Sequence, residues 1–411
     1  MATSTRTYKS DREAPATQQR KVIQLRSMAR RLVGLCLVAA SASVVTAAAL
    51  TDGAFSHSSS SSRAAARTIA VDVNHDRYNY SVGELLAMTD DQLPHIDPLV
   101  LNFAVARQIP GLDKLDVAKY ATQVDELAHR IDVANRVAEP QARDDPLYKL
   151  DRDLWWAGGM CVALAGPTFG ITYTESRLDP AHPEQAFLYG LLDSKVGTCA
   201  SMPVLYIAIG HRLGWPIKGV VSKDHMWARW DDGKPKELGG KRFNLEATSS
   251  TSDGVMGSFL STPDEEYAKE LGTSPLAISS GSDFTSLTPR QLLGVFLQSR
   301  AGYWAAKNDW QKAEQDLLAA RTCFPQNREL YTFLVEAMSR TGAKVFDAGE
   351  RRQLAALVTE PDGASNIHVF SPIHNPRQTL PRLSLAEVER INRENQRGMQ
   401  DPTDQQSAPP R

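Results

Sequence analysis

VGTCASMPVLYIAIG, residues 196–210, is the stretch that decides the fold. Thr198 is a plausible helix cap, and Pro203 is tolerated only near the first turn of a helix. The run from Val204 to Leu213 is almost wholly apolar, which is typical of a helix buried on most sides. The pattern therefore places Cys199 at the N-terminus of a central helix, where unpaired N–H groups and the helix dipole stabilise a thiolate.

Two alternating segments downstream supply the partners that a reactive thiol needs. Residues 223–230 alternate like a strand and put His225 on the same face as two other large polar or aromatic side chains. After a turn, residues 242–248 alternate again, with Asn244 and Glu246 on one face. A helix with a cysteine, a strand with a histidine and a strand with a carboxylate or amide give the order of a thiol triad. His225 is the predicted base, and Glu246 or Asn244 orients it.

Residues 197–248 resemble the transglutaminase-like superfamily of papain-related thiol enzymes. The motif of that superfamily is a Gly-x-Cys that opens a helix, a histidine that opens a strand, and the aspartate of an Asp-Pro-Thr in the next strand. Cys199 and His225 match this motif directly. Glu246, in the sequence Glu-Ala-Thr, stands where the aspartate is usual, so the orienting residue is either Glu246 or Asn244.

A wider stretch, residues 97–248 and the helices after it, resembles bacterial SirB1-like proteins. Many of those proteins lack the cysteine, so the retained Cys199 favours the catalytic branch. The resemblance implies an α+β fold in which a central buried helix packs on an antiparallel sheet. It also implies that an upstream side chain helps the Cys199 N–H bind an oxyanion. Gln185 and Tyr189 are the candidates for that side chain.

Residues 286–345 follow a tetratricopeptide-like pattern. The matching positions are Leu297, Trp304, Ala313, Leu317, Ala320, Pro325 and Leu334. Tyr331 follows Leu297 by 34 residues, which is one repeat period, whereas Arg300 stands where a leucine is usual. About one and a half repeats are predicted. An ordinary helical hairpin packed on the preceding domain is the alternative, since a lone repeat cannot bury its own face.

The ends of the chain have a different composition from the body. Residues 1–50 combine a basic flank with an uncharged run at 32–50, which predicts a signal peptide or a membrane anchor. Either one puts the body outside the cytoplasm. Residues 51–79 read as a flexible linker, 80–285 as the transglutaminase-like domain and 346–411 as a mostly disordered tail.

Local signals inside the body predict several further elements. Helices are expected at 97–107, at 116–140 with Pro140 as its end, at 151–164, at 185–192 and around 265–267. Residues 170–174 read as a short extended piece and 279–286 as a polar linker.

Composition narrows the class of function. The formal net charge of −2 gives no reason to expect nucleic acid. The four cysteines lie at positions 36, 161, 199 and 323, without the spacing of a disulfide framework or a structural zinc site. We therefore expect an exported thiol enzyme that needs no cofactor and forms an acyl-thioester on Cys199 from an amide of a protein or peptide.

Water would resolve that thioester in a hydrolase, and an amine would resolve it in an acyltransferase. Two other hypotheses stay open. One is a catalytically silent transglutaminase-like module that binds a protein partner through its repeat-like helices. The other is an unrelated structural or scaffold protein.

Overall fold

The computed structural model describes residues 75–342, except 166–168, 175–177, 223–224 and 246–262. The predicted leader or anchor at 1–50, most of the linker at 51–79, all of the tail at 346–411, and Glu246 lie outside the described residues. Within the part that is described, no helix is long and apolar enough to cross a membrane.

Five helices make up the N-terminal side of the described chain. They are α2 (Val82–Ala87), α3 (Pro98–Ala106), α4 (Val117–Ala142), α5 (Pro146–Leu150) and α6 (Arg152–Ala165). Asp97 caps α3 by accepting from the Leu99 N–H at 2.9 Å, and Asp116 caps α4 by accepting from the Lys119 N–H at 3.0 Å. The prediction that Pro140 ends α4 is wrong, because the helix continues to Ala142. Pro140 cannot donate to the Arg136 carbonyl, and the helix extends only two residues beyond it.

The single helix predicted at 185–192 is two short ones, α7 (Pro183–Ala186) and α8 (Leu188–Ser194). Phe187 between them has an extended backbone, which breaks the helical path. Gly190 of α8 lies against the main chain of Glu184, where a Cβ would come within 1.9 Å of the carbonyl oxygen. The absence of a side chain at Gly190 therefore allows the two helices to fold back on each other.

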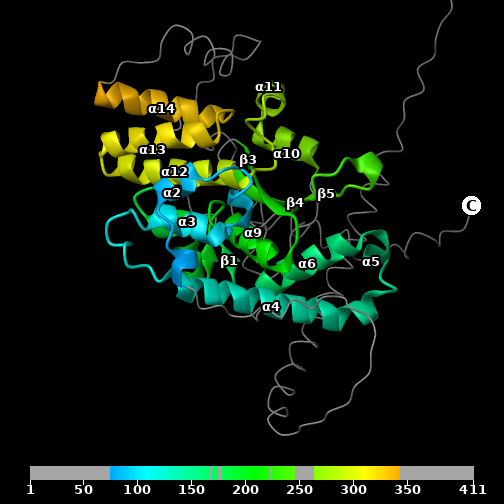
Figure 1. The fold of residues 1–411 in the computed structure, drawn as a ribbon. Coiled ribbons are helices and arrows are strands. Elements are labelled where there is room, and N and C mark those ends of the chain that lie inside the picture. The colour runs from blue at the N-terminus through cyan, green and yellow to red at the C-terminus, as the bar shows by residue number, and fades with distance from the viewer. Residues whose placement is uncertain (1–74, 166–168, 175–177, 223–224, 246–262, 343–411) are drawn as a thin grey trace, which may run out of the picture. The chain divides into compact units, whose positions relative to one another are not determined.

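The sheet and the central helix follow in the predicted order. Strand β1 (Thr172–Tyr173) pairs in parallel with β2 (Val196–Gly197), and the chain then enters α9 (Met202–Leu213). Strands β3 (Ile217–Ser222), β4 (His225–Asp231) and β5 (Arg242–Leu245) form an antiparallel sheet in the order β3-β4-β5 (Figure 1). Every residue of α9 from Met202 to Gly210 is buried, as the apolar run predicts.

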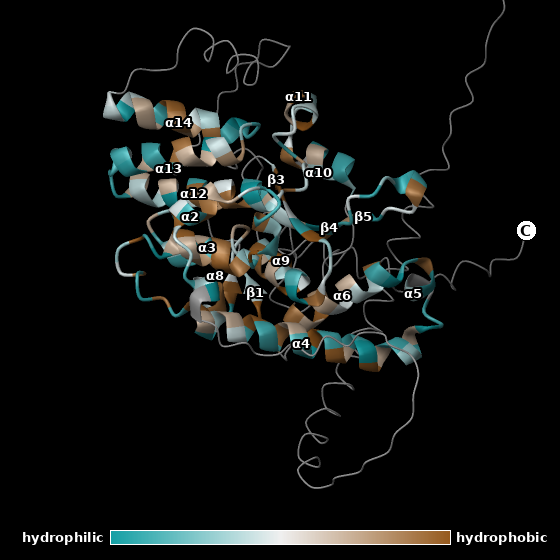
Figure 2. Cartoon of the chain, in the orientation of Figure 1, coloured by the Kyte–Doolittle hydropathy of each residue, from teal (hydrophilic) through white to brown (hydrophobic). Residues whose placement is uncertain are grey.

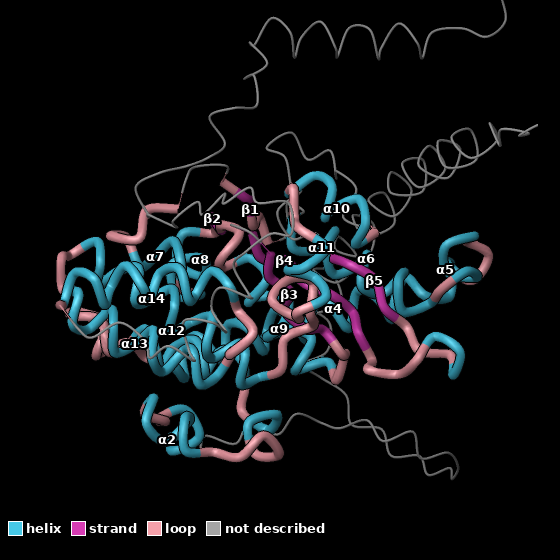
Figure 3. Tube along the Cα trace, turned by 90° about the horizontal axis from the view of Figure 1, so that it is seen from above, coloured by secondary structure: helices cyan, strands magenta, loops and turns pink. Residues whose placement is uncertain are grey.

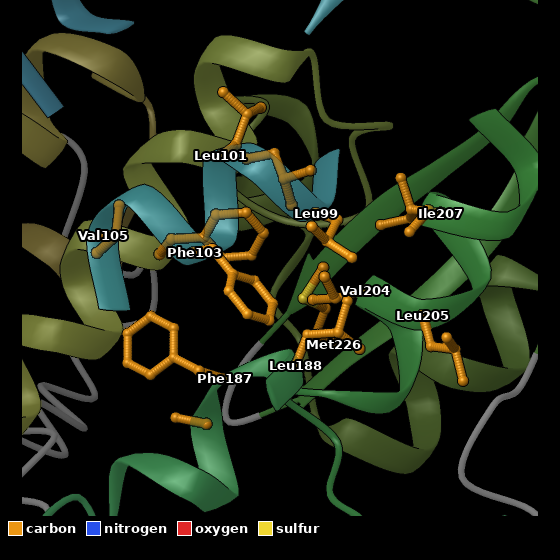
Figure 4. Packing of buried hydrophobic residues seen from close by; sticks show 14 of the residues in the cluster. Leu99, Leu101, Phe103, Val105, Phe187, Leu188, Val204, Leu205, Ile207 and Met226 are labelled. Atoms are coloured by element: carbon orange, nitrogen blue, oxygen red, sulfur yellow. The ribbon is translucent and has the colours of Figure 1, made fainter. Parts of the chain in front are cut away.

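Helix α9 packs against one face of this sheet. Gly210 approaches Ile217 so closely that a Cβ would lie 2.8 Å from the Ile217 Cβ, and the Ile207 Cδ1 lies 3.3 Å from the Cβ position of Gly219. Met226 lies beside Val204 in the same apolar layer, to which α3 and α8 also contribute (Figure 4). In Figure 2, brown apolar residues are concentrated on α3, α8 and α9, which form the centre of the core.

The other face of β4 has a different cover. Alternate residues Met226, Ala228 and Trp230 belong to the main core with α9. Trp227 instead clusters with Val220, with Phe284 and with Tyr267 of α10 (Asp264–Leu271). The strand is therefore buried on both sides.

Residues 279–286 are not the polar linker that the sequence predicts. Ser282, Asp283 and Phe284 are buried, the Phe284 N–H donates to the Val221 carbonyl at 3.0 Å, and Val220 forms an isolated bridge with Ser286. Hydroxyl side chains in this segment bond within the fold rather than to water, which composition alone does not reveal.

The remaining helices are α11 (Pro275–Ser279), α12 (Pro289–Ala306), α13 (Trp310–Cys323) and α14 (Arg328–Thr341). Short 3-10 turns lie at His75–Tyr78, Leu93–His95 and Lys236–Leu238. Helices α12, α13 and α14 lie side by side (Figures 1 and 3). One hydrophobic cluster includes residues of α3, α9 and all three of these helices.

The contacts of Arg300 in α12 explain why an arginine stands where the repeat pattern has a leucine. Arg300 is 4% exposed and pairs with Asp316 of α13 through two hydrogen bonds, of 2.5 and 2.7 Å. The same guanidinium donates to the Val105 carbonyl of α3 at 3.0 Å and to the Gln108 side chain at 2.6 Å. A leucine would make none of these contacts, so the arginine joins the C-terminal helices to α3.

Candidate functional site

Cys199 lies in a turn just before α9 rather than in its first helical turn. The helix begins at Met202, three residues later than predicted. Thr198 nevertheless caps the turn, because its Oγ1 accepts from the N–H groups of Ala200 at 3.1 Å and Ser201 at 3.4 Å. The Met202 N–H donates to the Thr198 carbonyl at 3.0 Å, so the turn leads directly into the helix.

Neighbouring segments hold this turn in place. The Thr198 hydroxyl donates to the Gln185 carbonyl at 2.7 Å, and the Thr198 N–H donates to Ser201 Oγ at 3.0 Å. Gly197 has no room for a side chain, since a Cβ would lie 2.5 Å from the Met202 side chain and 2.7 Å from that of Leu191. The glycine of the Gly-x-Cys sequence is therefore required by packing.

The two oxyanion candidates have contacts of their own. The Gln185 side-chain oxygen accepts from the Asp179 N–H at 2.8 Å, and its main-chain carbonyl accepts from Thr198. Tyr189 is buried in α8, and burial, aided by the negative charge of Glu184, raises the pKa of its phenol. Gln185 thus supports the Cys199 turn through its main chain, while Tyr189 belongs to the core.

His225 is the first residue of β4 and is half-buried. Its ring stacks on Trp227 with 5.8 Å between centroids and an interplanar angle of 22°. Trp227 in turn stacks on Tyr267 of α10, with centroids 4.8 Å apart. The imidazole therefore lies at the more exposed end of an aromatic stack on the sheet face that α10 covers.

The direction of α9 across the sheet brings Cys199 and His225 to the same end of the β3-β4 pair, although the His225 ring lies on the face opposite α9. Gly210 lies near Ile217, whose cross-strand partner is Trp230 at the far end of β4. Going back toward Met202, α9 passes Gly219, and the Cys199 turn follows after a further rise of about 7.5 Å. Strand β3 from Gly219 to Ser222, opposite His225, rises about 10 Å in the same direction.

Asn244 lies elsewhere on the strand pair. Its side-chain oxygen accepts from Trp227 Nε1 at 3.0 Å and from Arg229 Nε at 2.7 Å, and its amide donates to Asp264 at 2.7 Å. Asn244 pairs with Arg229, which is four residues and therefore about 13 Å along β4 from His225. The structure places Asn244 in a polar network around Arg229, and Glu246 lies outside the described residues.

Arg229 is the centre of that network and is fully buried. It pairs with Asp264 at 2.5 Å and donates to the Phe284 carbonyl at 2.7 Å. Burial lowers the pKa of Arg229 to about 10, against the opposing effect of the Asp264 carboxylate. Strand alternation puts Arg229 on the face of Trp227, but two of its partners, Asp264 and Phe284, come from segments more than thirty residues away.

The other described cysteines differ from Cys199 in exposure. Cys161 and Cys323 are buried and form no disulfide within the described part of the chain, whereas Cys199 is partly exposed. Burial also raises the pKa of the Cys323 thiol. Across the described ranges, no group of three or more His, Cys, Asp or Glu side chains gathers as a metal site requires.

Comparison with known protein families identifies a match that includes the Cys199 turn. Residues 119–297 match a family model described as the transglutaminase-like superfamily. The matched span begins in α4 and ends in α12, so it includes the Cys199 turn, α9 and the β3-β4-β5 sheet. Comparison with curated proteins gave no match, and neither did comparison with solved structures. The chain carries a transglutaminase-like domain at residues 119–297.

Proposed function

We propose that this chain is a thiol enzyme that forms an acyl-thioester on Cys199 from an amide of a protein or peptide. The observation that carries the proposal is the position of a partly exposed cysteine in a capped turn at the start of the buried helix α9. His225 begins β4 at the same end of the sheet, inside a transglutaminase-like domain.

The chemistry uses groups of the chain alone. His225 takes the proton of Cys199, and the thiolate attacks the amide carbonyl to give a tetrahedral oxyanion. Collapse of this intermediate breaks the C–N bond, His225 returns the proton to the leaving amine, and the acyl-thioester remains. Water then releases an acid, or a second amine takes the acyl group.

The hydrogen bonds of the turn favour one donor for the oxyanion. The N–H groups of Ala200, Ser201 and Met202 all donate to Thr198, and Pro203 has no N–H. Among the contacts of the described residues, the Cys199 N–H has no acceptor within the protein. A main-chain N–H left open beside the nucleophile is what an oxyanion hole requires.

For the third residue of the triad we propose Glu246 rather than Asn244. The Asn244 oxygen already accepts two hydrogen bonds, and its amide donates to Asp264. Strand alternation in the sequence puts Glu246 on the face of Asn244, two residues farther along the chain. Export of the body, the SirB1-like subtype and a partner-binding role of the tetratricopeptide-like helices α12–α14 are further parts of this proposal.

A second function is favoured by one specific observation. The His225 ring stacks on Trp227, on the sheet face opposite α9. A histidine held there as part of the aromatic cluster suits a catalytically silent module that binds a partner through its helices. Reactivity of Cys199 separates this function from the first.

The test is the pH dependence of iodoacetamide labelling of the full chain, with peptide mapping. Cys199 is expected to label at pH 6–7 with a rate about tenfold or more above its rate in His225→Ala. Cys161 and Cys323 are internal controls for folding, because both are buried. His211→Ala, which changes an exposed histidine on α9, should leave the rate unchanged. Equal labelling of Cys199 in the wild type and His225→Ala would reject the enzyme in favour of the binding module.

A further inference from the structure

A buried carboxylate that no sequence pattern singles out lies on the His225 face of the sheet. Asp283 is 7% exposed, and its two oxygens accept hydrogen bonds from Ser222 Oγ at 2.9 Å and Ser282 Oγ at 2.7 Å. Ser222 is the last residue of β3 and is itself 4% exposed. The carboxylate is thus attached to the end of β3 through a hydroxyl.

The number of hydrogens on each hydroxyl determines which of Thr273, Ser222 and Asp283 donates and which accepts. Ser222 Oγ also lies 2.8 Å from the hydroxyl of Thr273. A serine hydroxyl has one hydrogen, and Ser222 donates it to Asp283, so Thr273 must donate to Ser222. The hydroxyls of Ser222 and Ser282 therefore both donate to the Asp283 carboxylate, and Thr273 donates to Ser222.

The charge of Asp283 has no cation among the ion pairs that the described residues form. Arg229 is committed to Asp264 and to the Phe284 carbonyl. Arg328 of α14 approaches through its main-chain N–H, which donates to Ser282 Oγ at 3.1 Å, while its guanidinium donates to Ser274. A buried carboxylate is normally paired with a positive charge, so this site is suited to a cation.

His225 is the titratable group that the strand register brings to Ser222. The two residues are direct cross-strand partners at the end of the β3-β4 pair. Cβ atoms of such partners lie about 5 Å apart on the same face of the sheet. Residues 223–224, which join the two strands, lie outside the described residues. The register thus places an imidazole next to a hydroxyl that is bonded to a buried carboxylate.

We propose that Asp283 is a positioning residue that acts through Ser222 to hold His225 as an imidazolium beside the Cys199 thiolate. The proposal rests on the proposed thiol chemistry and adds to it a carboxylate from outside the strand that carries Glu246. A negative charge within about 4–6 Å favours the charged form of an imidazole. The Thr273 and Ser222 hydroxyls then orient the Asp283 carboxylate, and they do not carry the proton of Cys199.

Two measurements on the full chain test the proposal. In the first, NMR follows the titration of the His225 ring in the wild type, Asp283→Asn and Ser222→Ala. The midpoint is expected to fall by about 0.5–1 pH unit in Asp283→Asn and by less in Ser222→Ala. In the second, the labelling midpoint of Cys199 rises by a similar amount, so that its rate at pH 6.5 drops about threefold to tenfold.

Asp316→Asn is the matched control, since it removes another buried carboxylate, in the pair with Arg300. It should lower stability without moving either midpoint. Unchanged midpoints in Asp283→Asn would overturn the proposal. If that variant does not fold, an unchanged midpoint in Ser222→Ala would do so. Failure of the Cys–His pair itself appears differently, as labelling of wild-type Cys199 that does not depend on His225, while the His225 titration still reports on Asp283.

Discussion

The two faces of β4 are both buried, but they are built from different chemistry. On one face Met226, Ala228 and Trp230 join α9 in the main apolar core. On the other face, Trp227 packs against α10 and Phe284, and Arg229 donates hydrogen bonds to Asp264 of α10 and to the Phe284 carbonyl. Apolar packing tolerates many sequences of similar volume, whereas a buried guanidinium needs each of its partners.

The polar face also requires an uncommon backbone conformation. Phe284 has a φ of 62°, in the left-handed region that bulky residues rarely adopt. Its carbonyl accepts from Arg229 at 2.7 Å and from Arg242 at 3.1 Å. The comparison teaches that the face with the candidate base depends on a few specific hydrogen bonds, and the face with α9 depends on shape.

The largest effect is expected from Arg229→Met. It leaves Asp264 and the Phe284 carbonyl without their buried donor, so the free energy of unfolding should fall by about 3–5 kcal/mol in chemical denaturation. The double variant Arg229→Met with Asp264→Leu should recover a large part of this loss. Lys218→Met, at the position paired with Arg229, is the control and should change little. A loss below about 1 kcal/mol in the single variant would show that the polar face is as tolerant as the apolar one.

An intermediate effect is expected on the apolar face from Gly219→Ala. The new Cβ would lie 2.7 Å from the Met226 methyl and 3.3 Å from Ile207, so α9 or Met226 must shift. We expect a loss of about 1–3 kcal/mol, measured by thermal or chemical unfolding. Gly83→Ala is the control, because its Cβ would meet nothing nearer than Ser81 Oγ at 3.9 Å. An unchanged stability of Gly219→Ala would mean that this layer has room to relax.

The smallest effect concerns Asp231, where β4 ends. Burial acts to raise its pKa, but hydrogen bonds from Ser286 and the Gly233 N–H, with nearby positive charges, lower it overall. Because the folded state has the lower pKa, the stabilisation is present above about pH 4 and is lost as the pH falls through the folded pKa.

Acid titration of unfolding should therefore show a shallower loss below pH 4 in Asp231→Asn than in the wild type, with a difference under about 1 kcal/mol. Asp232→Asn serves as the neighbouring control. A steeper acid loss in Asp231→Asn would reverse the sign of this contribution.

Much of the fold was predictable because its signals are local. The apolar run after Cys199 predicted α9, and the alternation around His225 predicted β4. The helices predicted to start at Asp97 and Asp116 are α3 and α4, and these two residues are their caps. Each of these depends on residues a few positions apart, where side-chain periodicity and capping chemistry determine the structure.

The features that were missed depend on distant partners. Nothing near Asn244 in the sequence shows that Arg229 and Trp227 occupy its oxygen. The burial of Asp283 follows from its bond to Ser222, which is sixty-one residues earlier. The start of α9 at Met202 follows from the Thr198 side chain, which closes the turn before the helix. Tertiary contacts of this kind override local propensity.

The contacts of Arg300 with Asp316 and α3 limit where the chain can be truncated. The domain boundary that composition suggests, near residue 286, divides one continuous hydrophobic core. It also lies close to the buried ion pair of Arg300 and Asp316. Cutting there would remove the Arg300 donor from Val105 and Gln108 and would expose the apolar face that α12 covers. A fragment meant to fold on its own must therefore extend to the end of α14, and a fusion partner is better inserted after that helix.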